Sequence, residues 1–274
     1  MRALEAVHGW PVTSAAVAVL DRTGVLARTG PDEPMRWASV TKLVTALTVL
    51  VATEQGDVSL DEAAGPPGAT VRHLLAHASG IGAKDDSVLA APGRRRIYSN
   101  RGFDLLGELV SDRVGKPFPD YVAAAVFEPL GMTGTRLHGS PASGITGPLR
   151  DLAALGTELL VPTLAPDLRA EATRVAFPGI PGVLPGFGRQ SPNDWGLGFE
   201  IRDGKDPHWT GATNSPATFG HFGQSGSFLW VDPDAGLACA CLTGTPFGEW
   251  AATHWPPFSD LVIAEAGMGR PAAG

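Results

Sequence analysis

Ser39 and Lys42 stand three residues apart at the head of an apolar segment, a spacing that can activate a serine as nucleophile. Apolar residues recur at helical spacing over residues 40–51, which predicts a helix buried on one side. Positions three apart share a helix face, so the hydroxyl would lie beside the amine. Burial and the positive end of the helix dipole both favour a neutral amine, which can then take the serine proton. The alternative is a serine N-cap followed by a solvated lysine.

A second candidate group is Tyr98-Ser99-Asn100, in a loop that precedes a predicted helix. A tyrosine whose phenolate is stabilised by a nearby cationic amine can act as general base toward a serine. Asn100 offers a donor and an acceptor, suited to holding a substrate carbonyl and steadying the lysine. The alternative is a helix-entry loop in which Ser99 and Asn100 act only as caps.

The third group, His221-Phe222-Gly223, lies on a predicted strand late in the chain. Glycine in a strand often marks close approach by a ligand. An edge strand beside the nucleophile can supply a backbone N–H to an oxyanion, together with the N–H of Ser39. The alternative is a glycine-rich strand with a packed histidine.

These groups need a scaffold, and the sequence predicts strands at both chain ends with helices between them. We therefore expect an α/β (α+β) fold: an antiparallel sheet built from both ends, flanked by helices, with an all-helical insertion. The expected sheet domain comprises residues 1–65 and 194–274, and the expected mostly helical domain comprises 66–193, with the active site between them. The predicted strands are 12–20 and its hairpin partner to 28, then 197–201, 218–222, 227–231 and 237–242; the predicted helices include 71–78, 103–114, 121–127, 149–160 and 258–266.

The Pro- and Gly-rich stretch 177–193 is interpreted as an irregular connector, with a loop lining a pocket mouth as the alternative. Cys239 and Cys241 are two apart in a strand, too far for an ordinary disulfide, and are expected to be core thiols. Core thiols fit a reducing compartment.

Charge and composition limit the partners. The net charge of −7 and pI near 5.5 argue against nucleic acid, and the run 94–96 of three arginines is expected to be a solvated loop. The seven histidines form no ligand-spaced cluster, so neither a metal nor a cofactor is expected. We found no export signal and no membrane-length apolar stretch, and predict a cytoplasmic protein without membrane contact. The oligomeric state is left open.

The three groups together, in this order and spacing, resemble the serine hydrolases related to class C β-lactamases. That group includes D-alanyl-D-alanine carboxypeptidases and the family VIII esterases, which share S-x-x-K, Y-S-N and H-x-G motifs. The resemblance extends to the L-L-x-H-x-S-G segment at 74–80, the P-L-G-M turn at 129–132 and the strand and turn at 228–233.

The resemblance implies roles for individual residues. Ser39 would be the acylated nucleophile, with Lys42 and Tyr98 sharing the proton transfers. Asn100 would orient the substrate, and the backbone N–H groups of Ser39 and Gln224 would form the oxyanion hole.

The resemblance also bears on the third motif and on His77. His221 stands where relatives carry Lys or His, and Gly223 completes that motif; a competing alignment would place the third motif at 224–226. His77, at a helix end, is expected to be structural and away from the catalytic group.

Phe222 departs from the group, because a Thr or Ser there commonly holds a substrate carboxylate. Phe222 cannot do so. With the absent export signal, this favours a serine hydrolase that cleaves esters or related activated acyl compounds through an acyl-enzyme. The alternatives are a β-lactamase or carboxypeptidase, an acyltransferase with the same nucleophile, and a non-catalytic binding protein. The partner would be a small ester, amide or lactam.

Overall fold

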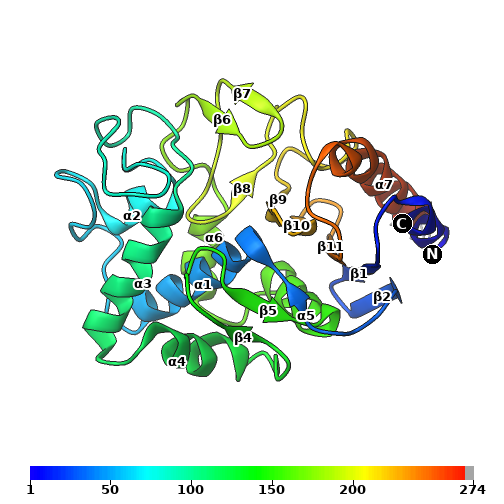
Figure 1. Cartoon of the computed structure of the whole chain (residues 1–274), viewed down its shortest axis with the longest axis horizontal. Helices are drawn as coiled ribbons and strands as arrows, with labels where there is room; N and C mark the ends of the chain where they lie inside the picture. Colours follow the sequence, from blue (N-terminus) through cyan, green and yellow to red (C-terminus); the bar gives the residue numbers. More distant parts are fainter. Residues whose placement is uncertain (269–274) are drawn as a thin grey trace, which may run out of the picture.

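The computed structural model of the protein describes residues 1–268 and is built around one six-stranded sheet (Figure 1). All neighbouring strands are antiparallel, and the sheet draws on both ends of the chain, as predicted. The strand order is β2 (Gly24–Thr29), β1 (Ala15–Asp21), β11 (Leu237–Thr243), β10 (Ser227–Asp232), β9 (Phe219–Gly223) and β8 (Glu200–Ile201).

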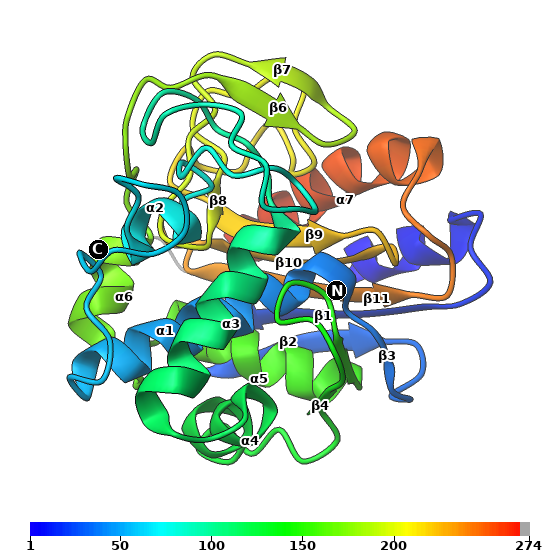
Figure 2. The same cartoon turned by 60° about the vertical axis from the view of Figure 1, so that its left-hand side comes forward.

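Both faces of the sheet are covered, because side chains along a strand alternate between two hydrophobic clusters. On β1, Ala16, Ala18 and Leu20 belong to one cluster, whereas Val17 and Val19 belong to the other. The first cluster includes helices α1 (Thr41–Glu54) and α5 (Leu149–Leu160), and the second includes α7 (Glu249–Met268) and the 3₁₀ helix η1 (Arg2–Gly9). Figure 2 shows these helices on opposite sides of the sheet.

The two cysteines lie on β11 and face the second cluster. Both Cys239 and Cys241 are buried and carry free thiols, as predicted. Burial raises the pKa of each thiol, so neither is a reactive thiolate.

Helix α1 is more enclosed than its sequence pattern indicated. A one-sided helix was predicted, but every residue from Thr41 to Ala52 is buried. The physical reason is its position at the centre of the molecule, where it contacts α3, α4, α6 and β9. A lysine in the first turn of this helix is therefore fully removed from water.

The insertion predicted to be all-helical is mostly helical but also contains short strands, because segments between its helices pair with one another and with β3. The helices are α2 (Val71–Leu75), α3 (Asn100–Val114), α4 (Phe118–Val122) followed by a π-helical turn η3 (Ala123–Phe127), α5, and α6 (Pro166–Ala172). A small sheet joins β3 (Met35–Arg36), β5 (Ile145–Gly147) and β4 (Arg136–Leu137), and β6 (Gly182–Leu184) forms a hairpin with β7 (Gly188–Gln190). Since α5 packs on β1, β10 and β11, the division of the chain at residues 66 and 193 stays a prediction.

Several predicted elements differ in extent from the observed ones. The helix expected at 71–78 ends at Leu75, and the helix expected at 103–114 begins at Asn100. The strand expected at 197–201 is reduced to Glu200–Ile201, and the closing helix begins at Glu249 instead of Phe258. Helix α7 contains Pro256 and Pro257, and a proline inside a helix removes a backbone hydrogen bond. Its apolar residues on both sides of the prolines pack in the second cluster, and this burial offsets the lost backbone hydrogen bonds. None of the helices within residues 1–268 combines the length and the hydropathy that crossing a bilayer requires.

Candidate active site

Ser39 lies in a 3₁₀ turn, η2 (Ala38–Val40), between β3 and α1. The preceding residue, Ala38, has a left-handed backbone with φ of +44°, a conformation that non-glycine residues adopt only under constraint. The constraint comes from Trp37, whose buried indole donates a hydrogen bond to the Gly147 carbonyl at 3.1 Å. This anchoring leaves the Ser39 side chain half-exposed at the head of α1.

Lys42 is fully buried, and its amine is surrounded by acceptors that carry no charge. Nζ donates to Asn100 Oδ1 at 2.7 Å and to the Ala142 carbonyl at 3.0 Å, and it lies 3.5 Å from Ser39 Oγ. Burial lowers the pKa of Lys42 to about 7, while the charge of Asp104 opposes this lowering. A neutral amine has two hydrogens and one lone pair. The two acceptors take the hydrogens, so the lone pair is left for the Ser39 hydroxyl.

Tyr98 is the third member of this cluster. Its ring lies beside the amine, with Lys42 Nζ 4.7 Å from the ring centroid, and its hydroxyl hydrogen-bonds Ser39 and lies 3.4 Å from His221 Nε2. Burial raises the pKa of Tyr98, and the hydrogen bond to Ser39 offsets this only in part. The resting hydroxyl is therefore protonated, which is the opposite of the phenolate that the sequence suggested. Its local chemistry is that of a proton donor.

His77 holds the loop that carries Tyr98. Its Nδ1 accepts the backbone N–H of Ser99 at 3.1 Å, and its ring centroid lies 4.7 Å from that of Tyr98. The expectation that His77 would be away from the catalytic group is wrong, since the left-handed backbone at His77 (φ +54°) turns the chain back under Tyr98. Burial lowers its pKa well below the ordinary value, so the ring is neutral.

Arg96 ties the same loop to the segment before β6. The expectation of a solvated loop is wrong at this residue: Arg94 and Arg95 are exposed, but Arg96 is buried. Its guanidinium donates to four backbone carbonyls, and burial lowers its pKa to about 10. The acceptors are Ala76 at 2.7 Å, Ala176 at 2.8 Å, Phe177 at 3.2 Å and Asn193 at 2.9 Å. Nothing in the sequence distinguished this arginine from its neighbours.

Asn100 begins α3, and Ser99 is the N-cap, accepting the Gly102 N–H at 2.9 Å. The Asn100 side chain directs Oδ1 toward Lys42. Within residues 1–268 its Nδ2 has no hydrogen-bond partner, so this donor remains available to a ligand.

His221 is buried on β9 and faces Tyr98 and Trp195. Its Nδ1 donates to the Phe222 carbonyl at 2.6 Å, which leaves Nε2 as an acceptor toward the Tyr98 hydroxyl. Burial and the Lys42 charge lower the pKa of His221 to about 3. The ring is therefore neutral in this tautomer and cannot supply a positive charge to a ligand.

Gly223 and Gln224 bring the end of β9 against the turn η2 that holds Ser39. A Cβ at Gly223 would lie 2.4 Å from the Trp37 carbonyl, so only glycine permits this approach. Among the described residues, no acceptor takes the backbone N–H of Ser39 or of Gln224. Two free N–H groups on adjoining segments are what an oxyanion hole requires.

Phe222 points into an aromatic cluster and also lines the pocket next to Ser39. Its ring centroid lies 4.8 Å from that of Phe247, 5.9 Å from that of Trp255 and 6.0 Å from that of Phe187. The pocket has a volume of about 70 Å³, well below the roughly 300–1,000 Å³ typical of sites for drug-sized ligands. Its other walls are Tyr98, Leu184, Pro185, Trp195, Glu200, His221 and Gln224.

The pocket is roofed by the β6–β7 hairpin, which lies over the β8–β9 edge of the sheet (Figure 2). Leu184 and Pro185 from this hairpin reach the pocket. The stretch 177–193 therefore lines the pocket, as the alternative interpretation stated, and is not only an irregular connector.

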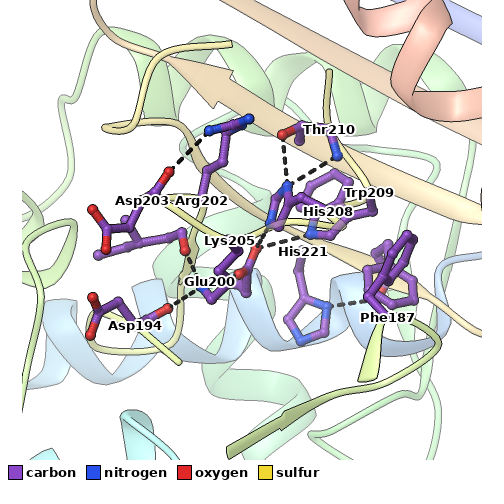
Figure 3. Close-up of polar contacts among 12 residues, drawn as sticks. Phe187, Asp194, Glu200, Arg202, Asp203, Lys205, His208, Trp209, Thr210 and His221 are labelled. Atoms are coloured by element: carbon purple, nitrogen blue, oxygen red, sulfur yellow. Dashed lines mark hydrogen bonds and ion pairs between the residues drawn. The ribbon is translucent and has the colours of Figure 1, made fainter. Parts of the chain in front are cut away.

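A buried ionic cluster supports the pocket from the β8 side (Figure 3). Glu200 Oε2 accepts hydrogen bonds from His208 Nε2 and Trp209 Nε1, both at 2.9 Å, and Oε1 pairs with Lys205. Lys205 also donates to the carbonyls of Asp194, at 2.6 Å, and Ile201. Sequence reasoning missed this cluster, because Glu200 on β8 and Lys205 and His208 in the following loop carry no motif that marks them.

The charge states in this cluster follow from its geometry. His208 Nδ1 accepts the Thr210 N–H at 3.1 Å, so Nε2 carries the ring proton and donates it to Glu200. Burial lowers the pKa of His208, and the neighbouring His208 and Lys205 bring that of Glu200 to about 2 against the opposing effect of burial. The wall of the pocket thus contains an ionised carboxylate whose oxygens are already engaged.

This pairing predicts a large stability loss for Lys205→Met. The substitution leaves an unpaired carboxylate in the interior, and breaking a buried pair in this way typically costs about 3–5 kcal/mol. Urea unfolding is the measurement, and the double variant Glu200→Gln/Lys205→Met is expected to recover part of the loss. Arg113→Gln, which breaks an exposed pair with Glu62, serves as control and should cost about 1 kcal/mol or less. Equal losses for the buried and exposed pairs would contradict this account.

Comparisons with known proteins identify the family and the fold to which this site belongs. A family model described as "Beta-lactamase" matches residues 3–262. A solved structure of a β-lactamase from Mycobacterium bovis superimposes with a TM-score of 0.95 at 54% sequence identity, covering 96% of this chain and 99% of that one. Simvastatin synthase from Aspergillus terreus superimposes with a TM-score of 0.76 at 17% identity, over 97% of both chains, which shows a shared fold.

Curated relatives match over shorter stretches. The D-alanyl-D-alanine-carboxypeptidase/endopeptidase AmpH of Escherichia coli is 28% identical over 183 residues, 49% of this chain and 48% of that protein. Penicillin-binding protein 4* of Bacillus subtilis is 28% identical over 134 residues, 37% of this chain and 30% of that protein. The chain thus spans half or less of the length of these curated relatives. Because the family model covers nearly all of residues 1–268, and the fold agrees from end to end with a 54% identical structure, the chain belongs to the beta-lactamase family.

Proposed function

We propose that the protein is a serine hydrolase that cleaves esters through an acyl-enzyme on Ser39. The observation that carries this proposal is the environment of Lys42: a buried amine with a pKa of about 7, both of whose hydrogens are held, and which lies 3.5 Å from Ser39 Oγ. A non-catalytic binding protein has no need of such an arrangement.

The protonation states of Lys42 and Tyr98 define the steps of the proposed ester hydrolysis. Ser39 Oγ attacks the ester carbonyl carbon while Lys42 Nζ takes the hydroxyl proton. The backbone N–H groups of Ser39 and Gln224 bind the oxygen on which charge develops. The bond to the leaving alcohol then breaks, and the Tyr98 hydroxyl gives its proton to the leaving oxygen, while the proton held by Lys42 restores that of Tyr98. Water repeats the sequence on the acyl-enzyme and releases the acid.

Esters are favoured over carboxylate-bearing substrates by the chemistry of the pocket. Its wall combines the Phe222 ring, a neutral His221 and the ionised Glu200. None of these groups offers a charge-assisted hydrogen bond to a carboxylate, because Phe222 has no donor, His221 is neutral and Glu200 is already paired with Lys205.

A substrate panel tests the proposal directly. Short-chain esters, β-lactams and peptides ending in D-alanine would be assayed together, with mass spectrometry of the intact protein during turnover. Ester hydrolysis with a transient acyl adduct on Ser39 supports the proposal, and an added alcohol acceptor separates hydrolysis from acyl transfer. Hydrolysis of chromogenic cephalosporins alone would point to a β-lactamase, and the absence of any Ser39 adduct would rule out the mechanism.

The pH dependence of kcat/KM is expected to rise through about pH 7 to an alkaline plateau. Only neutral Lys42 can accept the Ser39 proton, so activity is lost as pH falls below its pKa. His221, with a pKa near 3, and Tyr98, with a raised pKa, keep their protonation states over this range. A profile with a neutral ester measures this; a rate that falls as pH rises through 7 would require ammonium Lys42 and would contradict the assignment.

Substrate choice is expected to depend on Phe222. Neutral esters should show clearly higher kcat/KM than penicillins, because each missing charge-assisted hydrogen bond is worth about 1.5–3 kcal/mol, roughly ten- to a hundredfold. Phe222→Thr introduces a hydroxyl at this position and should reduce the difference in kcat/KM between neutral esters and penicillins.

Because Phe222 packs with Phe247 and Trp255, its replacement also leaves a cavity. Phe222→Leu is the matched control: it removes the ring without adding a hydroxyl, and should not improve penicillins. Assays are made below the melting temperature of each variant. An equal response to Leu and Thr, or a wild type that prefers β-lactams, would exclude this role for Phe222.

A further inference from the structure

A second, larger depression adjoins the turn that holds Ser39. It is an open groove of about 580 Å³ that is lined by Ala38 and Gln224 and continues along β3 past Arg36 to Pro34. Neither Tyr98 nor His221 lines it. The active site therefore has two arms, a small pocket that Ser39 lines and an extended groove, and the two adjoin at Gln224, which lines both.

The groove contains one unused charged group. Of the described residues that line it, Arg36 alone is ionisable, and no hydrogen bond or ion pair engages its guanidinium within residues 1–268. The polar side chains opposite are engaged: Gln224 Nε2 donates to the Phe247 carbonyl at 3.2 Å, and Thr243 Oγ1 to the Gly226 carbonyl at 3.1 Å. Ser225 Oγ bonds Ser227 Oγ at 3.0 Å. Arg36 is thus the free recognition group of the groove.

The direction of proton transfer decides which half of a substrate enters each arm. The leaving oxygen must face the Tyr98 hydroxyl that protonates it, so the alcohol lies in the small pocket. The carbonyl oxygen occupies the oxyanion hole between Ser39 and Gln224. The remaining substituent of the carbonyl carbon, the acyl chain, then points away from Tyr98, and the groove begins there.

Resting on the proposed ester hydrolysis, we infer that the groove binds the acyl chain and that Arg36 recognises an anionic group on that chain. The substrate class is an ester of a small alcohol with an acid that carries a second, anionic group. A guanidinium matches a carboxylate or phosphate in two parallel hydrogen bonds. The site thus disfavours substrates with an anionic group on the alcohol, which would lie next to Phe222 and Glu200. It favours substrates with an anionic group on the acyl chain.

Matched esters test this directly. Monomethyl esters of dicarboxylic acids, from succinic to suberic, place the anion on the acyl side; methyl esters of the fatty acids of equal length are neutral; acetyl esters of hydroxy acids place it on the alcohol side. We expect kcat/KM for the best monomethyl dicarboxylate to exceed that of its neutral partner by about three- to tenfold at low salt, the range for a partly exposed charged hydrogen bond. The ratio should decline toward one as salt screens the pair.

Arg36→Gln should bring the ratio of kcat/KM for the charged ester to that for the neutral ester down to about one. Arg36→Lys should leave this ratio above one but below the wild-type value. The control Arg28→Gln removes the same charge from β2, at the opposite edge of the sheet from β8 and β9, and should leave the ratio intact. A ratio near one in the wild type, or one that survives Arg36→Gln, overturns the inference while ester hydrolysis itself stands. Failure to hydrolyse any of the esters, neutral ones included, would overturn the proposed function instead.

Discussion

Replacement of Ser39 by alanine is expected to abolish ester hydrolysis and covalent labelling together. Removing the nucleophile of an acyl-enzyme typically costs about four orders of magnitude or more in kcat. A fluorophosphonate should add a single adduct to the wild-type protein, mapped by peptide mass spectrometry to Ser39, and none to the variant.

The matched control is Ser111→Ala, on α3, where no hydrogen bond of the serine hydroxyl is found within residues 1–268. The Ser111→Ala protein should be labelled by the fluorophosphonate and should hydrolyse esters as the wild type does. An adduct at another serine in the Ser39→Ala protein would transfer the nucleophile to that residue and end the assignment.

Lys42→Ala and Tyr98→Phe are each expected to lower kcat strongly, and the double variant should be little worse than the poorer single one. In the proposed mechanism the two groups relay the same proton, so removing either one interrupts the same transfer. Losses of residues that act as a unit do not multiply. Lys42→Met, which keeps most of the buried volume, separates loss of the amine from loss of packing.

The pH profile distinguishes the two roles further. Tyr98→Phe retains Lys42, so its residual activity should keep a rise near pH 7, whereas residual activity of Lys42→Met should lack it. If the losses of the two single variants multiply in the double variant, the two side chains act independently and the shared transfer is refuted.

Local patterns in the sequence were sufficient for much of the scaffold. The hairpin of β1 and β2, the turn between β10 and β11 and the bounds of α5 follow from apolar periodicity and turn residues, which act over a few positions. The family and its fold also followed from motifs, as the match over residues 3–262 confirms. The motif spacing placed Ser39 beside Lys42, because three positions make nearly one helical turn.

What the sequence alone could not supply was the environment of these groups. Lys42 approaches neutrality because α1 is enclosed on all sides, whereas its own apolar pattern indicated a single buried face. Tyr98 was expected to ionise next to a cation, but burial of the hydroxyl and neutrality of the amine keep its proton in place.

The residues that support the site could not be identified from the sequence either, because their burial depends on distant segments. Arg96, His77 and the Glu200–Lys205 pair look like surface charges or helix-end residues in the sequence, and only packing between distant segments makes them interior. The separation between motif residues reflects chain order alone, whereas desolvation depends on every segment that surrounds a group. The sequence therefore determined which side chains meet at Ser39, and the tertiary structure decided which of them hold protons, which carry charge and where a substrate has room to lie.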